Sequence, residues 1–461
     1  MIRKSLLKEF REKVGSENVF TDKADLFTYA YDAAVLDPVL PAAALRPVTS
    51  EALSHVVRLC NENRIPLTVR GAGTNLSGGT IPFPDDGVVV LTNTLNRILE
   101  INEADMYAVV QPGVVTAKLA AAVEAKGLFY PPDPGSQDVS TLAGNVAENA
   151  GGLRGLKYGI TRDYVMGIQF FDVNGELVKT GSRTVKCATG YNLGGLMIGS
   201  EGTLGIFNEI ILKLIPFPAS QKAMVAVFDK LDKASETVAG IIASRIVPAT
   251  LEFMDNFTIR AVEDFSHVGL PTDAAALLLI EFDGHPAPVV EDAEKVESLC
   301  RKNGATSVRV AKDASERDSV WAARRSALSA LANLKPTLVL EDATVPRSKI
   351  PDMVRAMQNI AEEYNISIGT FGHAGDGNLH PTILTDRRDK TEWERVESAI
   401  AAIFDRALEL GGTLSGEHGT GIAKSAFLEK ETGMAAINYS KRVKGALDPN
   451  NILNPGKVIG D

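Results

Sequence analysis

Glycine is distributed very unevenly along this chain of 461 residues. Of its 40 glycines, 25 fall in five short windows that together span 70 residues. The windows are residues 71–79, 135–159, 190–205, 369–377 and 411–421. Because glycine lacks a Cβ, it concentrates where the backbone takes a positive φ or approaches another group closely. We therefore expect the backbone to come close to another group at five places.

The composition is that of an ordinary folded protein of enzyme size. Hydrophobic residues make up 45% and charged residues 23% of the chain, which argues against long disordered or low-complexity segments. At this length two or more domains are expected. A net charge of −10 disfavours a nucleic-acid partner, because such binding depends on neutralising phosphates. No stretch approaches the ~18 apolar residues of a membrane span, so no transmembrane segment is expected.

The cysteines exclude one kind of cofactor. Cys60, Cys187 and Cys300 are far apart in the sequence, and there is no C-x-x-C motif. A disulfide framework is not expected, and the chain alone cannot supply four cysteine ligands to an iron–sulfur cluster. This usage suits a reducing cytoplasm. We expect a cytoplasmic protein, with peripheral attachment to a membrane through a partner as the alternative.

The pattern of elements predicts three parts. Residues 1–37 form a peripheral helical segment in this prediction. An α/β pattern then continues to a proline pair around Phe217, which predicts a first domain over residues 38–217. Beyond it, strands alternate with helices in an order typical of a ferredoxin-like layer, and further helices follow. A second domain is predicted over residues 218–461.

The first glycine window follows a predicted strand that ends at Arg70. Its glycines would let backbone N–H groups approach a pyrophosphate and form an anion nest. The window lacks the G-x-G-x-x-G spacing, and no Walker lysine follows it, so a tight structural loop is an equal alternative for this window alone. The second and third windows combine prolines with small residues, which would leave room for a flat ligand.

Three of the six histidines lie within or just after the last two windows: His373, His380 and His418. His373 and His380 would face opposite sides of a continuous strand, but a Gly375-Asp376-Gly377 turn removes that constraint. With one residue of the Glu417-His418 pair, they would offer two nitrogens and one further oxygen or nitrogen. Such a site suits zinc, manganese or iron, with positions left open for substrate. The alternative is that these are turn histidines that make local hydrogen bonds.

Taken together, the glycine windows resemble the FAD-binding domain of flavoproteins of the vanillyl-alcohol-oxidase type. The closer similarity is to the branch that holds D-lactate dehydrogenases, D-2-hydroxyglutarate dehydrogenases and the FAD-binding subunit of glycolate oxidase. It covers the chain from about residue 40 to the C-terminus. The resemblance implies an α+β fold: a two-subdomain FAD-binding domain, a ferredoxin-like α+β substrate domain and a C-terminal helical tail.

The resemblance places FAD against the first three windows and the C-terminal tail. The residues implied to line the pyrophosphate are Gly71, Ala72, Gly73, Thr74, Asn75, Gly78 and Gly79. Those implied to border the flavin and ribityl chain are Pro134, Gly135, Ser136, Thr141, Gly144, Asn145, Asn149, Gly151 and Gly152. The adenine side would be closed by Glu201, Gly205 and Ile206, and Asn454 would return toward the flavin. Some relatives attach FAD covalently through a histidine in the first window; here that window holds Thr74 and no histidine, so FAD is expected to be non-covalent.

The last two windows resemble the metal site of the D-2-hydroxy-acid dehydrogenases. The resemblance makes His373, His380 and Glu417 the ligands of one divalent transition metal, and His418 the base. The residues alone leave open which of Glu417 and His418 is ligand and which is base. Arg324 aligns with the residue that clamps the substrate carboxylate, as suits a bidentate guanidinium, with a solvated helix charge as the alternative.

The implied activity is FAD- and metal-dependent oxidation of a D-2-hydroxy acid, D-lactate or glycolate, to the 2-keto acid, with hydride transfer to flavin N5. The apolar Leu328 and Leu340 near Arg324 favour a short monocarboxylic acid over 2-hydroxyglutarate. The alternatives are a D-2-hydroxyglutarate dehydrogenase and a non-catalytic flavin-binding subunit of an electron-transfer complex. Since the chain carries no relay of its own, electrons are expected to pass to a protein acceptor, either an iron–sulfur subunit or an electron-transferring flavoprotein.

Overall fold

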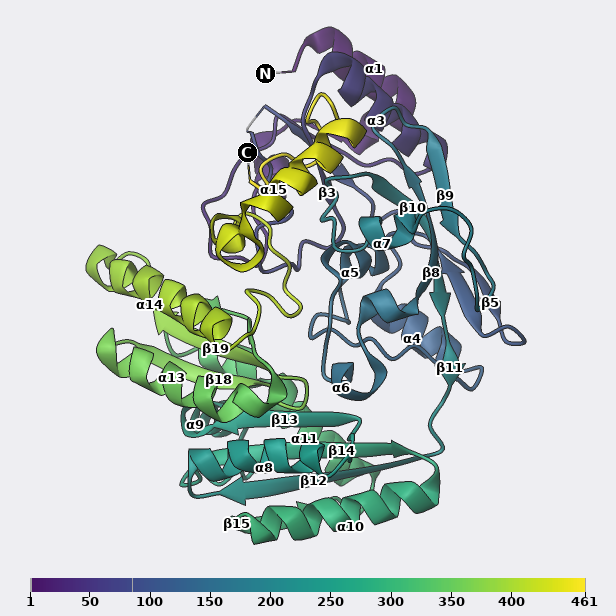
Figure 1. Cartoon of the computed structure of the whole chain (residues 1–461). Helices are drawn as coiled ribbons and strands as arrows, with labels where there is room; N and C mark the ends of the chain where they lie inside the picture. The colour runs from purple at the N-terminus through teal and green to yellow at the C-terminus, as the bar shows by residue number, and fades with distance from the viewer. Residues whose placement is uncertain (1, 85, 461) are drawn as a thin grey trace. The chain divides into compact units, whose positions relative to one another are not determined.

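A computed structural model of the chain describes residues 2–84 and 86–460. Met1, Asp85 and Asp461, which the expected domains include, lie outside the described residues. The chain forms two compact units, whose elements are labelled in Figure 1. The first unit comprises Met1–Ala150, Ile160–Phe217 and Glu417–Asp461, and the second comprises Gly151–Gly159 and Pro218–Gly416.

The first unit is built on two main sheets. One has the strand order β1 (Val19–Phe20), β2 (Ala43–Leu45), β4 (Val88–Leu91) and β3 (Leu67–Arg70). The other is antiparallel, in the order β5 (Ile98–Asn102), β6 (Tyr107–Val110), β10 (Ile206–Lys213), β8 (Val165–Phe171) and β9 (Leu177–Gly181). A short pair joins β7 (Leu128–Phe129) to β11 (Ile215–Pro216). Strands β8 and β9 pair as a hairpin around Asn174-Gly175, a dipeptide typical of tight hairpin turns.

Helices complete the first unit. They are α1 (Lys4–Val14), α2 (Lys23–Phe27), α3 (Ser50–Asn63), α4 (Thr116–Glu124), α5 (Leu142–Glu148), α7 (Leu193–Met197) and α15 (Leu428–Leu447). Helix α1 is not peripheral, contrary to expectation. Its Leu6 and Phe10 are buried in one hydrophobic core with Leu53 and Val56 of α3. Apolar residues four apart share a helix face, so the frequent charges of α1 occupy only its outer side.

The C-terminal segment also belongs to the core of the first unit. Ile452 and Leu453 are buried in the cluster that contains Leu67, and Leu453 forms a parallel bridge with Leu67. Residues 417–461 therefore pack with the FAD-binding part of the sequence, whereas the expected boundaries joined them to the second domain. Residues 151–159, expected in the first domain, group with the second unit.

The second unit is one eight-stranded sheet with helices. The strand order is β15 (Ala305–Val310), β12 (Ser220–Phe228), β14 (Ala276–Gly284), β13 (Thr250–Asp255), β18 (Ser367–His373), β19 (Asn378–Thr385) and β16 (Thr337–Leu340), with β17 (Ala343–Thr344) also on β19. The helices are α6 (Gly155–Tyr158), α8 (Leu231–Ala243), α9 (Asn256–Ser266), α10 (Pro286–Lys302), α11 (Ala314–Arg325), α12 (Ala327–Ala332), α13 (Ile350–Glu363) and α14 (Lys390–Glu409). Four short 3₁₀ helices, Ser16–Asn18, Thr161–Tyr164, Arg347–Lys349 and Ser425–Phe427, lie at connections in the described chain.

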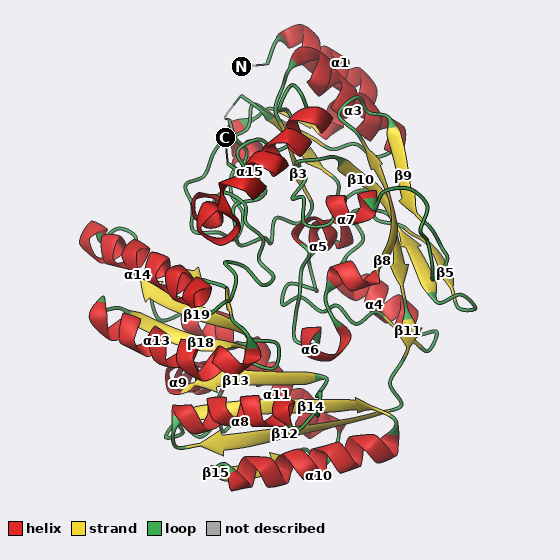
Figure 2. Cartoon of the chain, in the orientation of Figure 1, coloured by secondary structure: helices red, strands yellow, loops and turns green. Residues whose placement is uncertain are grey.

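The expected ferredoxin-like layer is the first half of this sheet. Strands β12, β13, β14 and β15 are connected through α8, α9 and α10 and lie in the order β15-β12-β14-β13, all antiparallel. Figure 2 shows the helices covering the sheet. Residues of α9, α11 and α12 share a buried cluster with Met254 of β13 and Phe371 of β18, so these helices cover one face. That face carries the residues discussed below.

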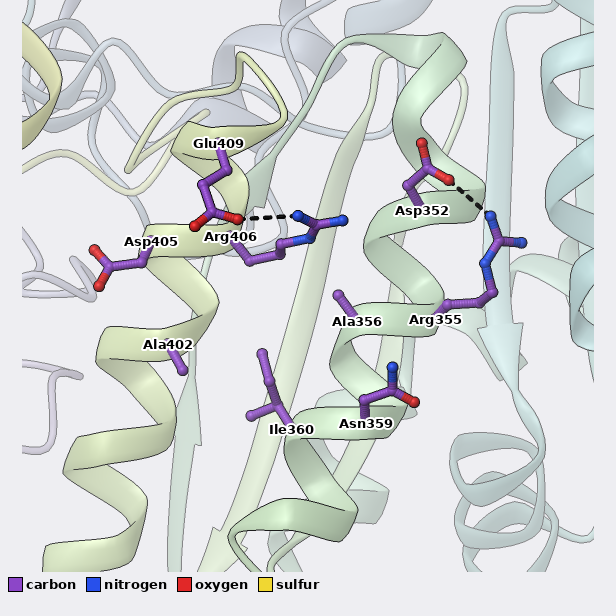
Figure 3. A pocket seen from close by; sticks show the side chains of 9 residues that line it. All are labelled: Asp352, Arg355, Ala356, Asn359, Ile360, Ala402, Asp405, Arg406 and Glu409. Carbon is purple, nitrogen blue, oxygen red and sulfur yellow. Dashed lines mark hydrogen bonds and ion pairs between the residues drawn. The ribbon is translucent and has the colours of Figure 1, made fainter.

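A groove lies between α13 and α14 in the second unit (Figure 3). Its charged side chains pair with one another: Arg355 with Asp352, and Arg406 with Glu409. None of the predicted site residues lines it. Across residues 2–84 and 86–460, no helix combines the length and the apolar character that crossing a bilayer requires.

Candidate active site

His373 and His380 stand on one face of a β-hairpin. Strand β18 ends at His373, β19 begins at Asn378, and the register sets Phe371 opposite His380. Residues directly opposite each other, and residues two apart along a strand, share a face of the sheet. The imidazole centroids of His373 and His380 are 5.0 Å apart, with the rings nearly perpendicular. The turn thus brings the two histidines together as its glycines predicted.

The turn between the strands requires glycine at one position in particular. Gly377 has a φ of +94°, and a Cβ built on it would collide with the backbone oxygen of Val345. Residues with a side chain rarely adopt that conformation. Gly377 therefore determines how β19 starts, and through it the position of His380 three residues later.

Glu417 follows a segment that is held against β17. The N–H of Thr413 donates to the Thr344 carbonyl, and Ser415 Oγ donates to Asp342 Oδ2 at 2.8 Å. A side chain at Gly416 would collide with Thr344 Oγ1, so the backbone passes close by. These contacts lead directly to Glu417.

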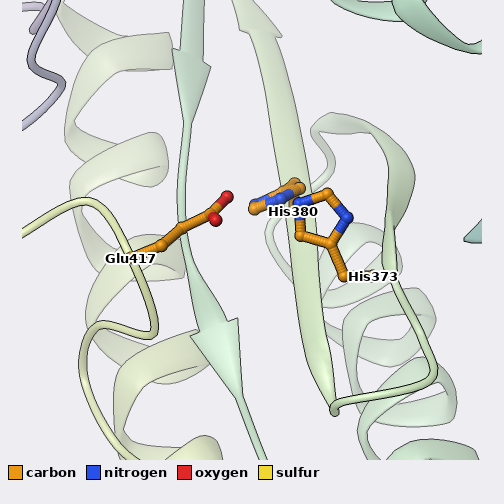
Figure 4. A group of neighbouring side chains, drawn as sticks. All are labelled: His373, His380 and Glu417. Carbon is orange, nitrogen blue, oxygen red and sulfur yellow. The ribbon is translucent and has the colours of Figure 1, made fainter. Parts of the chain in front are cut away.

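The potential ligand atoms of His373, His380 and Glu417 all lie within 4.8 Å of one another (Figure 4). Both histidines are buried and Glu417 is partly buried. Two imidazole nitrogens and one carboxylate oxygen are a donor set that suits zinc, manganese or iron. By their chemistry and spacing, these residues fit the metal that the resemblance implied.

Glu252 is the main candidate site residue that the sequence did not reveal. It lies on β13, is fully buried, and its Oε1 is 2.8 Å from Nδ1 of His373. Its Oε2 accepts hydrogen bonds from Nε of Arg324 at 2.8 Å and from Nη2 at 2.6 Å. The available signal was an acidic residue between the apolar Leu251 and Phe253 in a strand, since a buried charge needs partners.

The surroundings of Glu252 keep it ionised. Burial by itself raises the pKa of this carboxyl, but the charges of His373 and Arg324 and their hydrogen bonds outweigh burial and lower the pKa below its ordinary value. The carboxylate thereby connects a candidate metal ligand to the candidate substrate clamp.

Arg324 is buried, whereas its neighbour Arg325 is exposed. The guanidinium carbon of Arg324 lies 4.7 Å from the centroid of the Phe371 ring. Glu252 occupies the edge formed by Nε and Nη2. A guanidinium has five N–H donors, so the Nη1 side can still bind an anion. Burial rules out the alternative of a solvated helix charge.

His418 lies beside Glu417 in the chain, and its Nε2 is 3.9 Å from Glu417 Oε1. Both side chains are largely buried, with 9% and 14% exposed. The two residues thus lie close enough to exchange the roles of ligand and base, and the assignment made from the resemblance remains a prediction.

Within the first unit, the first glycine window meets residues 141–148 of the second window, Glu201 of the third and the C-terminal tail. A side chain at Gly71 would collide with Thr141 Oγ1, and a Cβ on Gly79 would lie 2.9 Å from Glu148 Oε1. Asn454 Nδ2 donates to the carbonyls of Gly79 at 2.9 Å and Glu201 at 2.6 Å. The remaining expected FAD residues of this unit are Ala72, Gly73, Thr74, Asn75, Gly78, Pro134, Gly135, Ser136, Gly144, Asn145, Asn149, Gly205 and Ile206.

The convergence leaves polar groups that suit a polar cofactor. Ser77 Oγ, Ser200 Oγ and Asn454 Oδ1 are buried and have no hydrogen-bond partner among the described residues. Around Gly135, no heavy atom lies within 4 Å of the position that a Cβ would take. Buried polar groups are normally satisfied, so these atoms fit a ligand with many hydrogen-bonding groups, as FAD is.

Several expected FAD residues also have structural roles. Asn145 donates to Thr116 Oγ1 at 2.7 Å inside the protein, and the side chain of Ile206 belongs to the hydrophobic core. Asn149 has a φ of +56° and accepts a hydrogen bond from the N–H of Arg162. Gly151 and Gly152 group with the second unit. Because the side chain of Ile206 lies in the core, a cofactor would contact mainly the backbone of that residue.

Two family descriptions match the chain in succession. "FAD binding domain" matches residues 41–181, and "FAD linked oxidases, C-terminal domain" matches residues 217–458. The glycolate oxidase subunit GlcD of Bacillus subtilis (strain 168) is 51% identical over 459 residues, which covers 100% of this chain and 97% of that protein. The D-lactate dehydrogenase of Anaerostipes hadrus is 36% identical over 93% of this chain and 91% of that protein.

A solved structure supports the fold. The crystal structure of p-cresol methylhydroxylase with substrate bound superposes with a TM-score of 0.82 at 18% identity, covering 99% of this chain and 96% of that one. The predicted α+β architecture is thereby confirmed, as are the predicted resemblance and the class of FAD-dependent enzyme. The chain belongs to the family of FAD-linked oxidases, with an FAD-binding domain followed by the family's C-terminal domain.

Proposed function

We propose that the chain is an FAD- and metal-dependent dehydrogenase that oxidises a D-2-hydroxy acid, glycolate or D-lactate, to the 2-keto acid. The observation that carries the proposal is the group His373, His380 and Glu417, with Glu252 and Arg324 beside the histidines, in a chain with an FAD-binding domain. Relatives named as a glycolate oxidase subunit and a D-lactate dehydrogenase support this substrate class.

The side chains divide the work in this proposal. When bound, FAD supplies the hydride acceptor and a divalent metal lowers the pKa of the substrate hydroxyl. The Glu252 carboxylate forms a hydrogen bond with Nδ1 of His373. This leaves Nε2 of His373 as the atom that would bind the metal. Arg324 binds the substrate carboxylate through its Nη1 side, and His418 accepts the hydroxyl proton, a task for which the pKa of imidazole is well placed.

The substrate is proposed to be short. Glu252 already occupies one edge of Arg324, so this guanidinium has room for one further carboxylate. Leu340 of β16 packs against the cluster that contains Phe371 and offers no polar partner to a second acid group, whereas the side chain of Leu328 is exposed. Steady-state kinetics with glycolate, D-lactate and D-2-hydroxyglutarate compare these acids directly, and a kcat/KM highest for D-2-hydroxyglutarate would establish the alternative substrate.

Electrons are proposed to leave through a protein acceptor. In the described part of the chain, Cys60 and Cys300 are buried and Cys187 is exposed, and the three do not form a cluster. An iron–sulfur subunit or an electron-transferring flavoprotein therefore takes the electrons in this proposal. Reoxidation of the reduced enzyme by O₂ alone at the full catalytic rate would argue against it.

The decisive experiment mixes the purified holoprotein anaerobically with glycolate or D-lactate. We expect the flavin absorbance to bleach, and to bleach much more slowly after treatment with EDTA until Mn²⁺ or Zn²⁺ is added back. L-lactate serves as the control and should leave the spectrum unchanged. Absence of bleaching with every D-2-hydroxy acid would favour the alternative of a non-catalytic flavin-binding subunit.

A further inference from the structure

Glu417 and His418 stand on a short backbone segment, Glu417–Gly421, in the first unit. The residues that follow are fixed, since Ile422 N and Ala423 N both donate to the Ser77 carbonyl, at 2.9 and 3.0 Å. The segment itself contains no helix or strand. Something other than regular secondary structure must therefore set the backbone that carries the two side chains.

The side chain of Glu201 supplies that support. Its Oε1 accepts hydrogen bonds from the N–H groups of Thr420 at 2.7 Å and Gly421 at 3.1 Å, and its Oε2 lies 2.9 Å from Gly421 N. Glu201 is only 5% exposed. Hydrogen bonds from N–H groups to a carboxylate are stronger than those between neutral groups, and burial strengthens them further.

Glu201 is itself rigidly placed. Its N–H donates to the Ala147 carbonyl at 2.9 Å, and its carbonyl accepts from Asn454 Nδ2 at 2.6 Å. Its φ of +50° is unusual for a residue with a long side chain and is kept by these surrounding contacts. A carboxylate held in this way can transmit its position to the segment that it binds.

The segment also packs directly on a second carboxyl. Gly419 has a φ of +80°, and a Cβ built on it would collide with Glu148 Oε2 and lie 3.0 Å from Glu201 Oε1. Burial raises the pKa of Glu148 well above its usual range, and the nearby charge of Glu201 adds to the rise. Among the described residues, no hydrogen bond from the backbone of the segment to Glu148 is found, so Glu148 is a suitable comparison for Glu201.

We propose that Glu201 is a positioning residue for Glu417 and His418, and that its carboxylate anchors the backbone of their segment through Thr420 and Gly421. This role differs from the place beside the adenine that the resemblance implied. The inference rests on the proposed metal and base roles of Glu417 and His418. Groups that orient metal ligands typically contribute 10- to 100-fold to metal affinity, so a roughly 10- to 100-fold effect is expected here.

The test compares Glu201→Gln with Glu148→Gln. The first variant keeps one acceptor oxygen but replaces the other by an NH₂ group, so it loses the negative charge and one of the two oxygens that face Gly421 N. The second variant makes the same change at the neighbouring carboxyl, which in the described part of the chain accepts no hydrogen bond from the segment's backbone. Both holoproteins are treated with EDTA, their FAD content is recorded, and Mn²⁺ is titrated calorimetrically. We expect Glu201→Gln to weaken Mn²⁺ binding by roughly 10- to 100-fold with FAD content retained, and Glu148→Gln to change it by less than about twofold.

Two results of this titration would overturn the inference. One is unchanged Mn²⁺ affinity in Glu201→Gln. The other is loss of FAD with Mn²⁺ affinity preserved, which would indicate that Glu201 binds FAD, as the resemblance implied. Rescue of turnover in Glu201→Gln by excess Mn²⁺ would add support, because a general loss of folding would not respond to the metal.

Hydrogen exchange on the wild-type holoprotein keeps the inference testable if Glu201→Gln does not fold or if the wild type binds no Mn²⁺. The amides of Thr420 and Gly421 should exchange at least about tenfold more slowly than those of the exposed segment 184–191. Equally fast exchange would overturn the anchoring role. Slow exchange without Mn²⁺ binding would keep the anchor and reject the proposed metal, so the two failures are distinguishable.

Discussion

Nη2 of Arg324 lies 2.6 Å from Oε2 of Glu252, and both side chains are almost completely buried. The other carboxylate oxygen of Glu252 engages His373. A single residue thus connects the candidate carboxylate clamp to a candidate metal ligand. Removing its charge should disturb both functions at once.

The first prediction concerns Glu252→Gln. The amide cannot accept from both Arg324 and His373 as the carboxylate does, so kcat/KM and metal affinity should each fall by about 10- to 100-fold, with FAD content unchanged. Glu281→Gln is the matched control, since Glu281 is also a buried carboxyl of this sheet and accepts from Nε1 of Trp321 at 2.7 Å. Equal losses in the two variants would contradict a specific role for Glu252.

The second prediction concerns the turn that joins the two histidine strands. Gly377→Ala introduces a Cβ against the Val345 carbonyl at a φ of +94°, which should destabilise the hairpin by at least about 1–3 kcal/mol. Gly445→Ala is the control: Gly445 lies within α15 and has no heavy atom within 4 Å of the added Cβ. It should stabilise the protein by up to about 1 kcal/mol. Urea denaturation of both variants measures the difference, and a harmless Gly377→Ala would be incompatible with the geometry.

The third prediction concerns Asp255, which caps α9. It accepts from the N–H groups of Thr258 and Thr370, each at 2.8 Å, and burial raises its pKa from 3.8 to about 6. Because the folded state holds this proton more tightly, the contribution of Asp255 to stability is fully present below pH 4 and is lost as the pH rises to about 6. The loss amounts to roughly 3 kcal/mol at 1.36 kcal/mol per pKa unit.

The comparison of wild type with Asp255→Asn isolates this contribution. Between pH 4 and pH 6.5 the stability of the wild type relative to the variant should decrease, and above that range the difference should stay constant. Urea midpoints at several pH values provide the measurement. If the stability of the wild type relative to Asp255→Asn instead increased with rising pH, the predicted direction of the pH dependence would be wrong.

The fourth prediction is that FAD is held without a covalent bond. The first window contains Thr74 and no histidine, and none of the first three windows contains a cysteine. Acid or heat denaturation should therefore release all the yellow colour into the supernatant. Colour that stays with the precipitated polypeptide would contradict it, and the spectrum of the supernatant quantifies the released flavin.

Local features of the sequence were the most predictable. The Asn174-Gly175 hairpin and the meeting of His373 with His380 depend on turns of a few residues, and glycine marks such turns directly. Glu252 could not be found in this way. Its partners Arg324 and His373 are 72 and 121 residues away in the sequence, so only the folded sheet brings them together.

Long-range packing also explains why the structure differs from the sequence-based expectation at both ends of the chain. Residues 1–37 were expected to form a peripheral helical segment, yet the face of α1 formed by Leu6 and Phe10 packs into the core. The final segment was expected to stay with the residues before it, but Leu453 pairs with Leu67, 386 positions earlier in the printed sequence. Hydrophobic periodicity identifies a buried face, but it does not identify the partner of that face.

The pairing of Leu453 with Leu67 has a consequence for biosynthesis. Ile452 and Leu453 fill the core of the first unit, and they are translated after the whole of the second unit's segment Pro218–Gly416. Domains made early usually fold while later ones are still being translated. Here the first unit cannot close its core until the second unit has been translated, so a nascent chain shows unfilled apolar surface to chaperones during that time. A stop codon between residues 417 and 452 would therefore remove part of the first unit's core.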